Sequence, residues 1–69
     1  DPFQTALAEH QAGRLDRAEF LYREALRADP GHADALHLLG VVAHQKGLPD
    51  AAVALILDAI RLHPTAAAY

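Results

Sequence analysis

The sequence of 69 residues contains no cysteine, methionine, tryptophan or serine, and it has only two phenylalanines and two tyrosines. Because cysteine is absent, the chain can form no disulfide, no thiolate metal site and no cysteine nucleophile. The absence of serine and of any glycine-rich phosphate loop removes the common nucleophile and nucleotide-binding motifs. We therefore expect no enzymatic activity from this chain and no cofactor.

Basic residues are also few: six lysines and arginines stand against nine acidic residues, for a net charge of −3. Binding to phosphates needs clustered basic side chains, and here they are scattered along the chain. The longest apolar run covers residues 51–57, far short of the roughly 20 residues that span a bilayer, and no signal peptide is visible. We expect neither a nucleic acid nor a membrane as a partner, and the lack of cysteine favours a cytoplasmic location.

Alanine and leucine dominate the apolar residues, which make up 52% of the sequence. Small and straight-chain apolar residues favour helices, whereas a sheet would need more β-branched residues. A chain of this length holds one small domain at most, near the lower limit for a single hydrophobic core. The predicted fold class is all-α.

The sequence repeats itself after 34 residues, with ten identities in thirty-five comparisons. Chance at this alanine-rich composition would give roughly three or four, so the period is informative. The identical pairs are His10/His44, Gln11/Gln45, Gly13/Gly47, Asp16/Asp50, Ala18/Ala52, Leu21/Leu55, Ala25/Ala59, Arg27/Arg61, Pro30/Pro64 and Ala33/Ala67.

Capping and helix-breaking residues predict two helices in the first repeat. Asp1 and Pro2 are typical of an N-cap and a first-turn proline, opening a helix that runs to about residue 12. Gly13 ends it, because glycine readily takes the positive φ of a helix C-terminus. Asp16, with Glu19 three residues later, predicts a capping box at the start of a second helix, which ends before the next proline.

The second repeat follows the same scheme. A helix is expected over residues 33–46, with a stop at Gly47. Pro49 opens another helix, which closes at residues 63–64. Thr65 is placed to cap the first helix of a third unit.

Small residues recur at the positions where the two helices of each repeat are expected to cross. Alanine or glycine at such a position lets two helix backbones approach closely. These residues are Ala6, Ala18 and Ala25 in the first repeat and Gly40, Ala52 and Ala59 in the second.

A 34-residue helix-turn-helix unit with these small residues, a glycine between its helices and a closing proline resembles the tetratricopeptide repeat. The resemblance covers nearly the whole chain, and it implies helical hairpins stacked in a right-handed superhelix, an α-solenoid. The repeats would be residues 1–32 and 33–66, with a third beginning at 67–69; the sequence does not decide whether the first three residues are native. Departures from the family pattern are Leu36 and Pro49, which stand where aromatic residues are frequent.

The resemblance also implies a function, because the first helices of such repeats line a concave face that binds an extended peptide or a partner helix. The lysines and asparagines with which some members clamp chaperone C-termini are missing here, as is the asparagine ladder of others. The stretch HQAGRLDRAEFLYREAL looks like segments of bacterial multidomain proteins, so a tethered enzyme elsewhere stays open. The residues expected on the concave face are Phe3, Leu7, His10, Gln11, Asp34, His37, Val41, His44 and Gln45.

Five histidines raise the question of a metal site. His37 and His44 lie seven positions apart, about 10 Å along a helix axis, whereas zinc-binding pairs on a helix are usually four apart. His10 and His44 are repeat equivalents on one expected surface, but no third ligand is evident. His32 and His63 flank the turns that close the repeats, as surface residues at helix ends. We therefore predict no metal site.

A structural or self-assembly role is the alternative to peptide binding. The last predicted helix is apolar nearly all round, whereas a helix that ends an array should carry a polar stripe. We expect the sequence to come from a longer array and to leave an apolar face on this helix uncovered. Such a face favours association, by end-to-end packing or by exchange of helices between copies. The residues expected to contribute to it are Val53, Ile56, Leu57 and Ile60.

Overall fold

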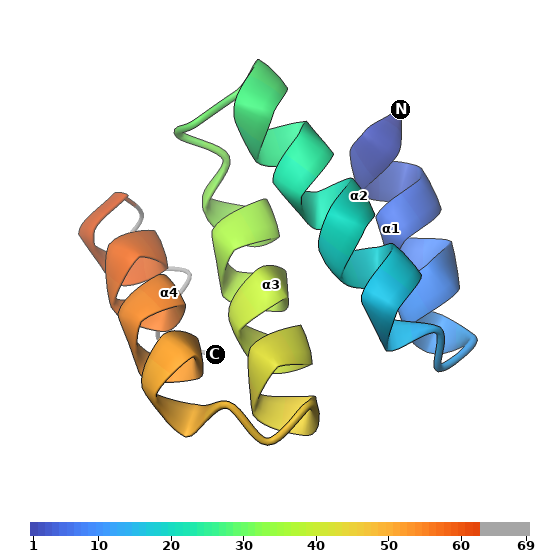
Figure 1. The fold of residues 1–69 in the computed structure, drawn as a ribbon. Coiled ribbons are helices and arrows are strands. Elements are labelled where there is room, and N and C mark those ends of the chain that lie inside the picture. The colour runs from blue at the N-terminus through green and yellow to red at the C-terminus, as the bar shows by residue number, and fades with distance from the viewer. Residues whose placement is uncertain (63–69) are drawn as a thin grey trace.

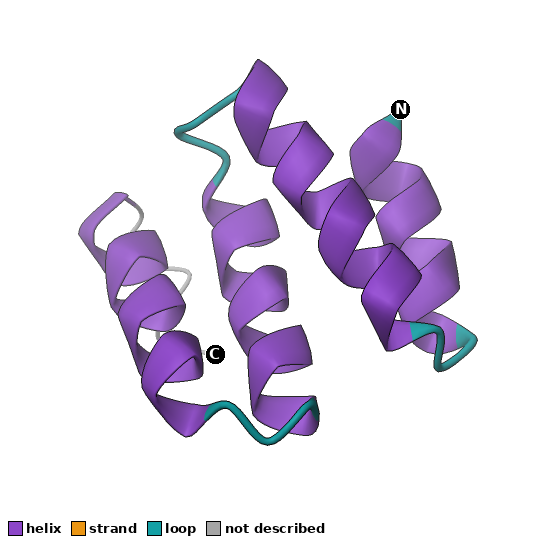
Figure 2. Ribbon diagram, viewed as in Figure 1, coloured by secondary structure: helices purple, strands orange, loops and turns teal. Residues whose placement is uncertain are grey.

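The computed structural model describes residues 1–62, which form four helices. They are α1 (Pro2–Gln11), α2 (Leu15–Ala28), α3 (Ala33–Gln45) and α4 (Pro49–Leu62). Short loops join them, and the described part of the chain contains no strand (Figure 2). The prediction of an all-α fold with two helices in each repeat is confirmed, while the expected third unit and its cap at Thr65 lie outside the described residues.

The helices follow one another in chain order across the molecule (Figure 1). Helix α1 packs on α2 and α3 packs on α4, which makes two hairpins, and α2 packs on α3 to join them. Within residues 1–62, no helix is both long enough and apolar enough to cross a bilayer.

The first three helices begin in different ways, and two of them have a side-chain cap. The Asp1 side chain accepts a hydrogen bond of 3.0 Å from the backbone N–H of Phe3, as its position before Pro2 predicts. The predicted capping box at Asp16 is wrong: α2 begins one residue earlier, and Arg14 at its N-cap makes no capping hydrogen bond. Helix α3 is capped by a histidine, because Nδ1 of His32 accepts a hydrogen bond of 3.1 Å from the N–H of Ala35.

The first helix of each hairpin ends at a glycine with positive φ, as predicted. Gly13 has a φ of 80° and Gly47 one of 78°. In both turns the N–H of the glycine donates to the carbonyl three residues back, and the next N–H donates to the carbonyl five residues back. This is the Schellman pattern, which satisfies two of the carbonyl groups that a helix leaves unpaired.

The core contains the small residues predicted at the helix crossings, all of which are buried. The closest approach is at Gly40, where an added Cβ would stand 2.7 Å from Cγ1 of Ile56 and 3.2 Å from the carbonyl oxygen of Ala52. Tyr22 and Val42 are the largest fully buried side chains. The central cluster consists of Ala6, Ala18, Tyr22, Leu39 and Val42.

Candidate protein-binding face

His10 joins three helices through its two ring nitrogens. Nδ1 lies 3.1 Å from the hydroxyl oxygen of Tyr22 on α2. Nε2 lies 2.8 Å from Oε1 of Gln45 at the end of α3. The amide oxygen of Gln45 can only accept a hydrogen bond, so in a neutral imidazole Nε2 carries the hydrogen and Nδ1 accepts from the Tyr22 hydroxyl.

Tyr22 depends on this contact because its side chain is fully buried. Burial raises the pKa of its phenol, since the ionised form would lose its hydration. A buried hydroxyl without a partner is costly, and within residues 1–62 no buried side-chain polar atom lacks one. His10 therefore satisfies a core tyrosine and at the same time fixes the end of α3 against α1.

The opposite ends of α1 and α3 meet through aromatic rings. The ring of Phe3, near the start of α1, lies with its centroid 4.4 Å from that of His32 at the N-cap of α3. Phe3 also packs against Tyr22, with ring centroids 6.0 Å apart. These contacts bring the start of α1 close to the start of α3, and the hydrogen bond between His10 and Gln45 brings their ends together. Helices α1 and α3 thus run side by side and in the same direction.

We define the α1–α3 face by the nine residues that were predicted to line a concave surface. Some of these side chains are held by contacts within the protein, and the others are exposed or half-buried. Phe3 and Leu7 pack on the core cluster, and His10 and Gln45 are tied to each other. The other five differ in how far their side chains are exposed to solvent. Gln11, Asp34 and His44 are exposed, whereas His37 and Val41 are half-buried.

His44 shows how the two repeats differ at this face. It is the repeat equivalent of His10, but the residue equivalent to Tyr22 is Ile56, which has no hydroxyl to offer. His44 is exposed, and no hydrogen bond of its imidazole is seen among residues 1–62. The two equivalent histidines therefore differ within residues 1–62, because both ring nitrogens of His10 are hydrogen-bonded.

A polar cluster between the C-terminal end of α3 and the start of α2 was not predicted from the sequence. Nζ of Lys46 lies 2.6 Å from a carboxylate oxygen of Asp16 and 2.7 Å from one of Glu19, both on α2. The bond from Lys46 lowers the pKa of each carboxyl, and the bonds from Asp16 and Glu19 raise the pKa of the lysine. The two acids interpreted as a capping box instead connect the hairpins. The sequence does contain one signal for this contact: Lys46 is the single lysine of the chain, and its repeat equivalent is Ala12.

The structure separates the four residues predicted for self-association. Val53 and Leu57 are exposed, at 57% and 46% of their surface. Ile56 and Ile60 are half-buried, and Ile56 lies against Gly40 of α3. A charge at position 56 would therefore disturb the hairpin itself, and Leu57 is the better position for testing association.

Two open hollows lie near loops of the described residues. One of about 500 Å³ lies between the first turn and Lys46. Another, of about 250 Å³, lies at the loop before α3 and includes Asp34 in its lining. Among residues 1–62, no group of three or more histidines and acids could hold a metal ion.

Comparison with known proteins agrees with this architecture. A model of the family described as tetratricopeptide repeat, whose members generally serve as protein-interaction modules, matches residues 3–67. A search of curated proteins gives no significant match. The matched region spans both hairpins and nearly all of the sequence, so the chain belongs to the tetratricopeptide repeat family.

Proposed function

We propose that this chain is a protein-binding module that holds an extended peptide or a partner helix across the α1–α3 face. The observation that supports it most is the bond of 2.8 Å between His10 and Gln45. With the contact of Phe3 and His32, it holds two parallel helices together at both ends. A surface fixed in this way loses little conformational freedom when a partner binds, which favours affinity.

The exposed part of the face indicates what kind of segment it suits. His44 and Gln11 offer an imidazole and an amide that can both donate and accept hydrogen bonds. Val41 adds a half-buried apolar side chain, and His37 adds a half-buried imidazole. Asp34 is the one carboxylate among the nine residues of the face, so a partner with a basic group at that end is favoured.

Selection from a library of random displayed peptides on the immobilised protein tests this proposal. Peptides that are enriched on the parent protein should lose at least about tenfold in affinity on a variant carrying Gln11→Ala and His44→Ala. Both side chains are exposed, so the variant should keep its helical content.

The matched control carries Arg17→Ala and Arg27→Ala, two exposed substitutions on α2. It should bind the selected peptides as the parent does. Loss of binding in this control, with no loss in the Gln11 and His44 variant, would place the site elsewhere and contradict the proposal.

Self-association through α4 is the second candidate, and the exposure of Val53 and Leu57 favours it. They lie four positions apart, and therefore about 6 Å along one side of the helix. An apolar pair of this kind on an outer helix is a typical contact point between chains. Sedimentation equilibrium should show a mass that rises with concentration for the parent and a monomer for Leu57→Glu. A parent that stays monomeric at high concentration would refute this candidate.

A further inference from the structure

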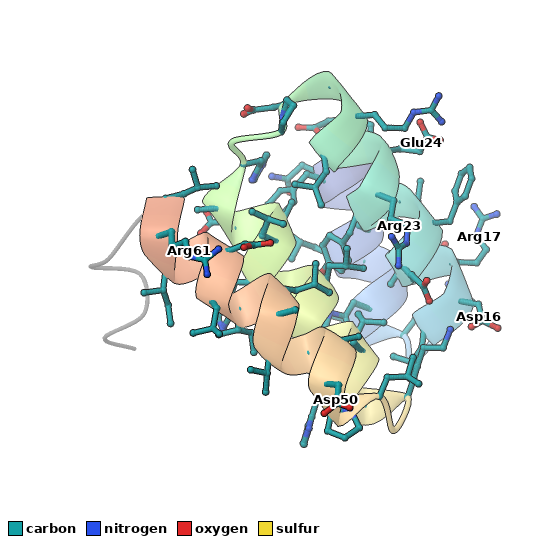
Figure 3. The ribbon with its side chains drawn as sticks, turned by 60° about the vertical axis from the view of Figure 1, so that its left-hand side comes forward. Asp16, Arg17, Arg23, Glu24, Asp50 and Arg61 are labelled. Carbon is teal, nitrogen blue, oxygen red and sulfur yellow. The ribbon has the colours of Figure 1, made fainter. Side chains whose placement is uncertain are left out.

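Helix α2 also presents an exposed apolar side chain on its outer side. Phe20 is 60% exposed, which makes it the most exposed of the large apolar residues in residues 1–62. Arg17 precedes it by three positions and Arg23 follows it by three, and their side chains are 66% and 61% exposed. Figure 3 shows both arginines along α2. We call Arg17, Phe20, Arg23 and Arg27 the outer face of α2.

The glutamates that pair with these arginines lie deeper than the guanidinium groups. The Glu9 carboxylate is shared by Arg14 and Arg17, and only 16% of that side chain is exposed. Glu19 is shared by Arg23 and Lys46, with 29% of its side chain exposed. The arginines of the outer face of α2 therefore lie outside the glutamates that pair with them. The exposed carboxylate on this side is that of Asp16 at the start of α2, with 89% of its side chain exposed, and it is bonded to Lys46. The ion pairs involved are those of Glu9, Asp16, Glu19 and Glu24 with Arg14, Arg17, Arg23, Arg27 and Lys46.

Helix α4 carries the opposite balance around its own apolar pair. Asp58 is paired with Arg61 at 3.0 Å. Asp50 has no ion-pair partner among residues 1–62, and Figure 3 shows it at the start of α4. It precedes Val53 by three positions. We call Asp50, Val53 and Leu57 the outer face of α4, an exposed apolar pair with an uncompensated carboxylate at one end.

We infer that the outer face of α2 on one copy of this chain docks on the outer face of α4 on another copy. Phe20 would pack between Val53 and Leu57, and an arginine would reach Asp50. An arginine stands three positions from Phe20 on either side, about 4.5 Å along the axis, and Asp50 stands about 7.5 Å before the midpoint of Val53 and Leu57. The remaining distance of about 3 Å lies within the reach of a long, flexible arginine side chain. The match therefore holds whichever way the two helices cross.

The charges also distinguish this pairing from a symmetric one. Packing α2 against α2 would bring Arg17 and Arg23 of one copy onto those of the other, and like charges in contact oppose association. Packing α4 against α4 would leave Phe20 exposed on both copies. The inference rests on the proposed association through α4, and it adds the surface that α4 meets.

Two variants, Phe20→Glu and Leu57→Glu, test the inference when they are measured separately and then mixed. Each places a carboxylate among the apolar contacts of one face, at a position exposed in the structure. Sedimentation equilibrium should show each variant as a monomer where the parent associates, a weakening of more than about tenfold. An equimolar mixture should associate again, because one variant supplies an intact α4 face and the other an intact α2 face.

The control is His44→Glu, an exposed substitution on the α1–α3 face, which should associate as the parent does. Circular dichroism verifies that each variant is folded, and Phe20→Gln and Leu57→Gln replace any variant that is not. If Leu57→Glu is monomeric while Phe20→Glu associates like the parent, α4 meets a different surface and the inference is wrong. If the two variants fail to associate when mixed, the inference is also wrong, although association through α4 still stands.

Discussion

The two hairpins share a backbone plan but use different chemistry at equivalent positions. In the first hairpin, Ala6 and Tyr22 occupy positions that Gly40 and Ile56 occupy in the second. The tyrosine is fully buried and needs His10 for its hydroxyl. The isoleucine has no polar group and instead fills the space that a side chain at position 40 would need.

The outer helices differ as well. Glu19 and Arg23 of α2 are replaced by Val53 and Leu57 at the equivalent positions of α4. The first pair forms ion pairs on the surface, whereas the second pair exposes apolar side chains. The small residues at the helix crossings are thus shared by the two hairpins, while the residues that do not repeat give their surfaces different chemistry.

The greatest loss of stability is expected at the small residues where the helices cross, which both hairpins share. Replacing Ala18 or Ala52 by leucine should lower the free energy of unfolding by about 3 kcal/mol, because extra methyl and methylene groups must fit into a closed crossing. The two alanines are 0% and 4% exposed. Denaturant melts measure the loss, with the exposed Ala54→Leu as a control that should stay within about 0.5 kcal/mol of the parent. A neutral result at Ala52 would show that α3 and α4 do not approach there.

The two equivalent histidines should differ in how much their loss destabilises the protein. His10→Ala should cost about 2 kcal/mol, because it leaves the buried hydroxyl of Tyr22 without a partner. In a Tyr22→Phe background the same substitution should cost clearly less, since no hydroxyl remains to be satisfied. The matched control is His44→Ala, which should be nearly neutral because His44 is exposed. Equal losses at the two histidines would remove the distinction between the repeats.

A smaller effect is expected at Gly40. Alanine normally stabilises a helix interior by about 1 kcal/mol relative to glycine. Here the new Cβ would stand 2.7 Å from Ile56 and 3.2 Å from a backbone carbonyl. We therefore expect Gly40→Ala to lower the stability by about 1 kcal/mol. At Gly31, where a Cβ would be in ordinary contact at 3.7 Å, the same substitution should be neutral or slightly stabilising.

The smallest effect concerns the ion pairs that connect the hairpins. Lys46 holds the pKa of Asp16 and of Glu19 below their ordinary values of 3.8 and 4.5, and its own pKa lies above 10.5. The acids therefore contribute to the stability of the fold above pH 4.5, and this contribution is lost as the pH falls through their folded-state pKa values. That of the lysine is present below pH 10.5 and is lost as the pH rises through its folded-state value.

Thermal melts of the parent and of Lys46→Met over a pH series measure this contribution. The parent should be the more stable between these limits, and the difference should shrink toward both extremes and with added salt. A difference that is independent of pH would mean that the stem of the lysine, rather than its charge, stabilises the hairpins.

The sequence predicts much of this fold because helix ends depend on local chemistry. Asp1, Pro2 and the two glycines act within one turn of their own position, and the small residues recur with the repeat. The start of α2 was misread because Asp16 and Glu19 fit a local capping pattern, whereas their partner is 27 to 30 positions away. Contacts over such distances depend on how the hairpins stack.

The candidate face was predicted as a set of positions but not as a set of contacts. A repeat alignment places His10 and His44 on one surface, and it cannot tell that one of them serves a buried tyrosine. In the same way, the apolar run of α4 does not by itself separate Ile56, which faces α3, from Leu57, which is exposed. These distinctions depend on the rotation of each helix in the packed structure.

The proposed binding of partners on the α1–α3 face can be mapped residue by residue. The isotope-labelled protein is titrated with a peptide selected on it, and the backbone amide resonances are followed. We predict that the largest shifts map to α1 and α3, around Gln11, His37 and His44, and that α2 residues such as Arg23 change little. Shifts concentrated on the outer faces of α2 and α4, with the α1–α3 face unchanged, would contradict the claim.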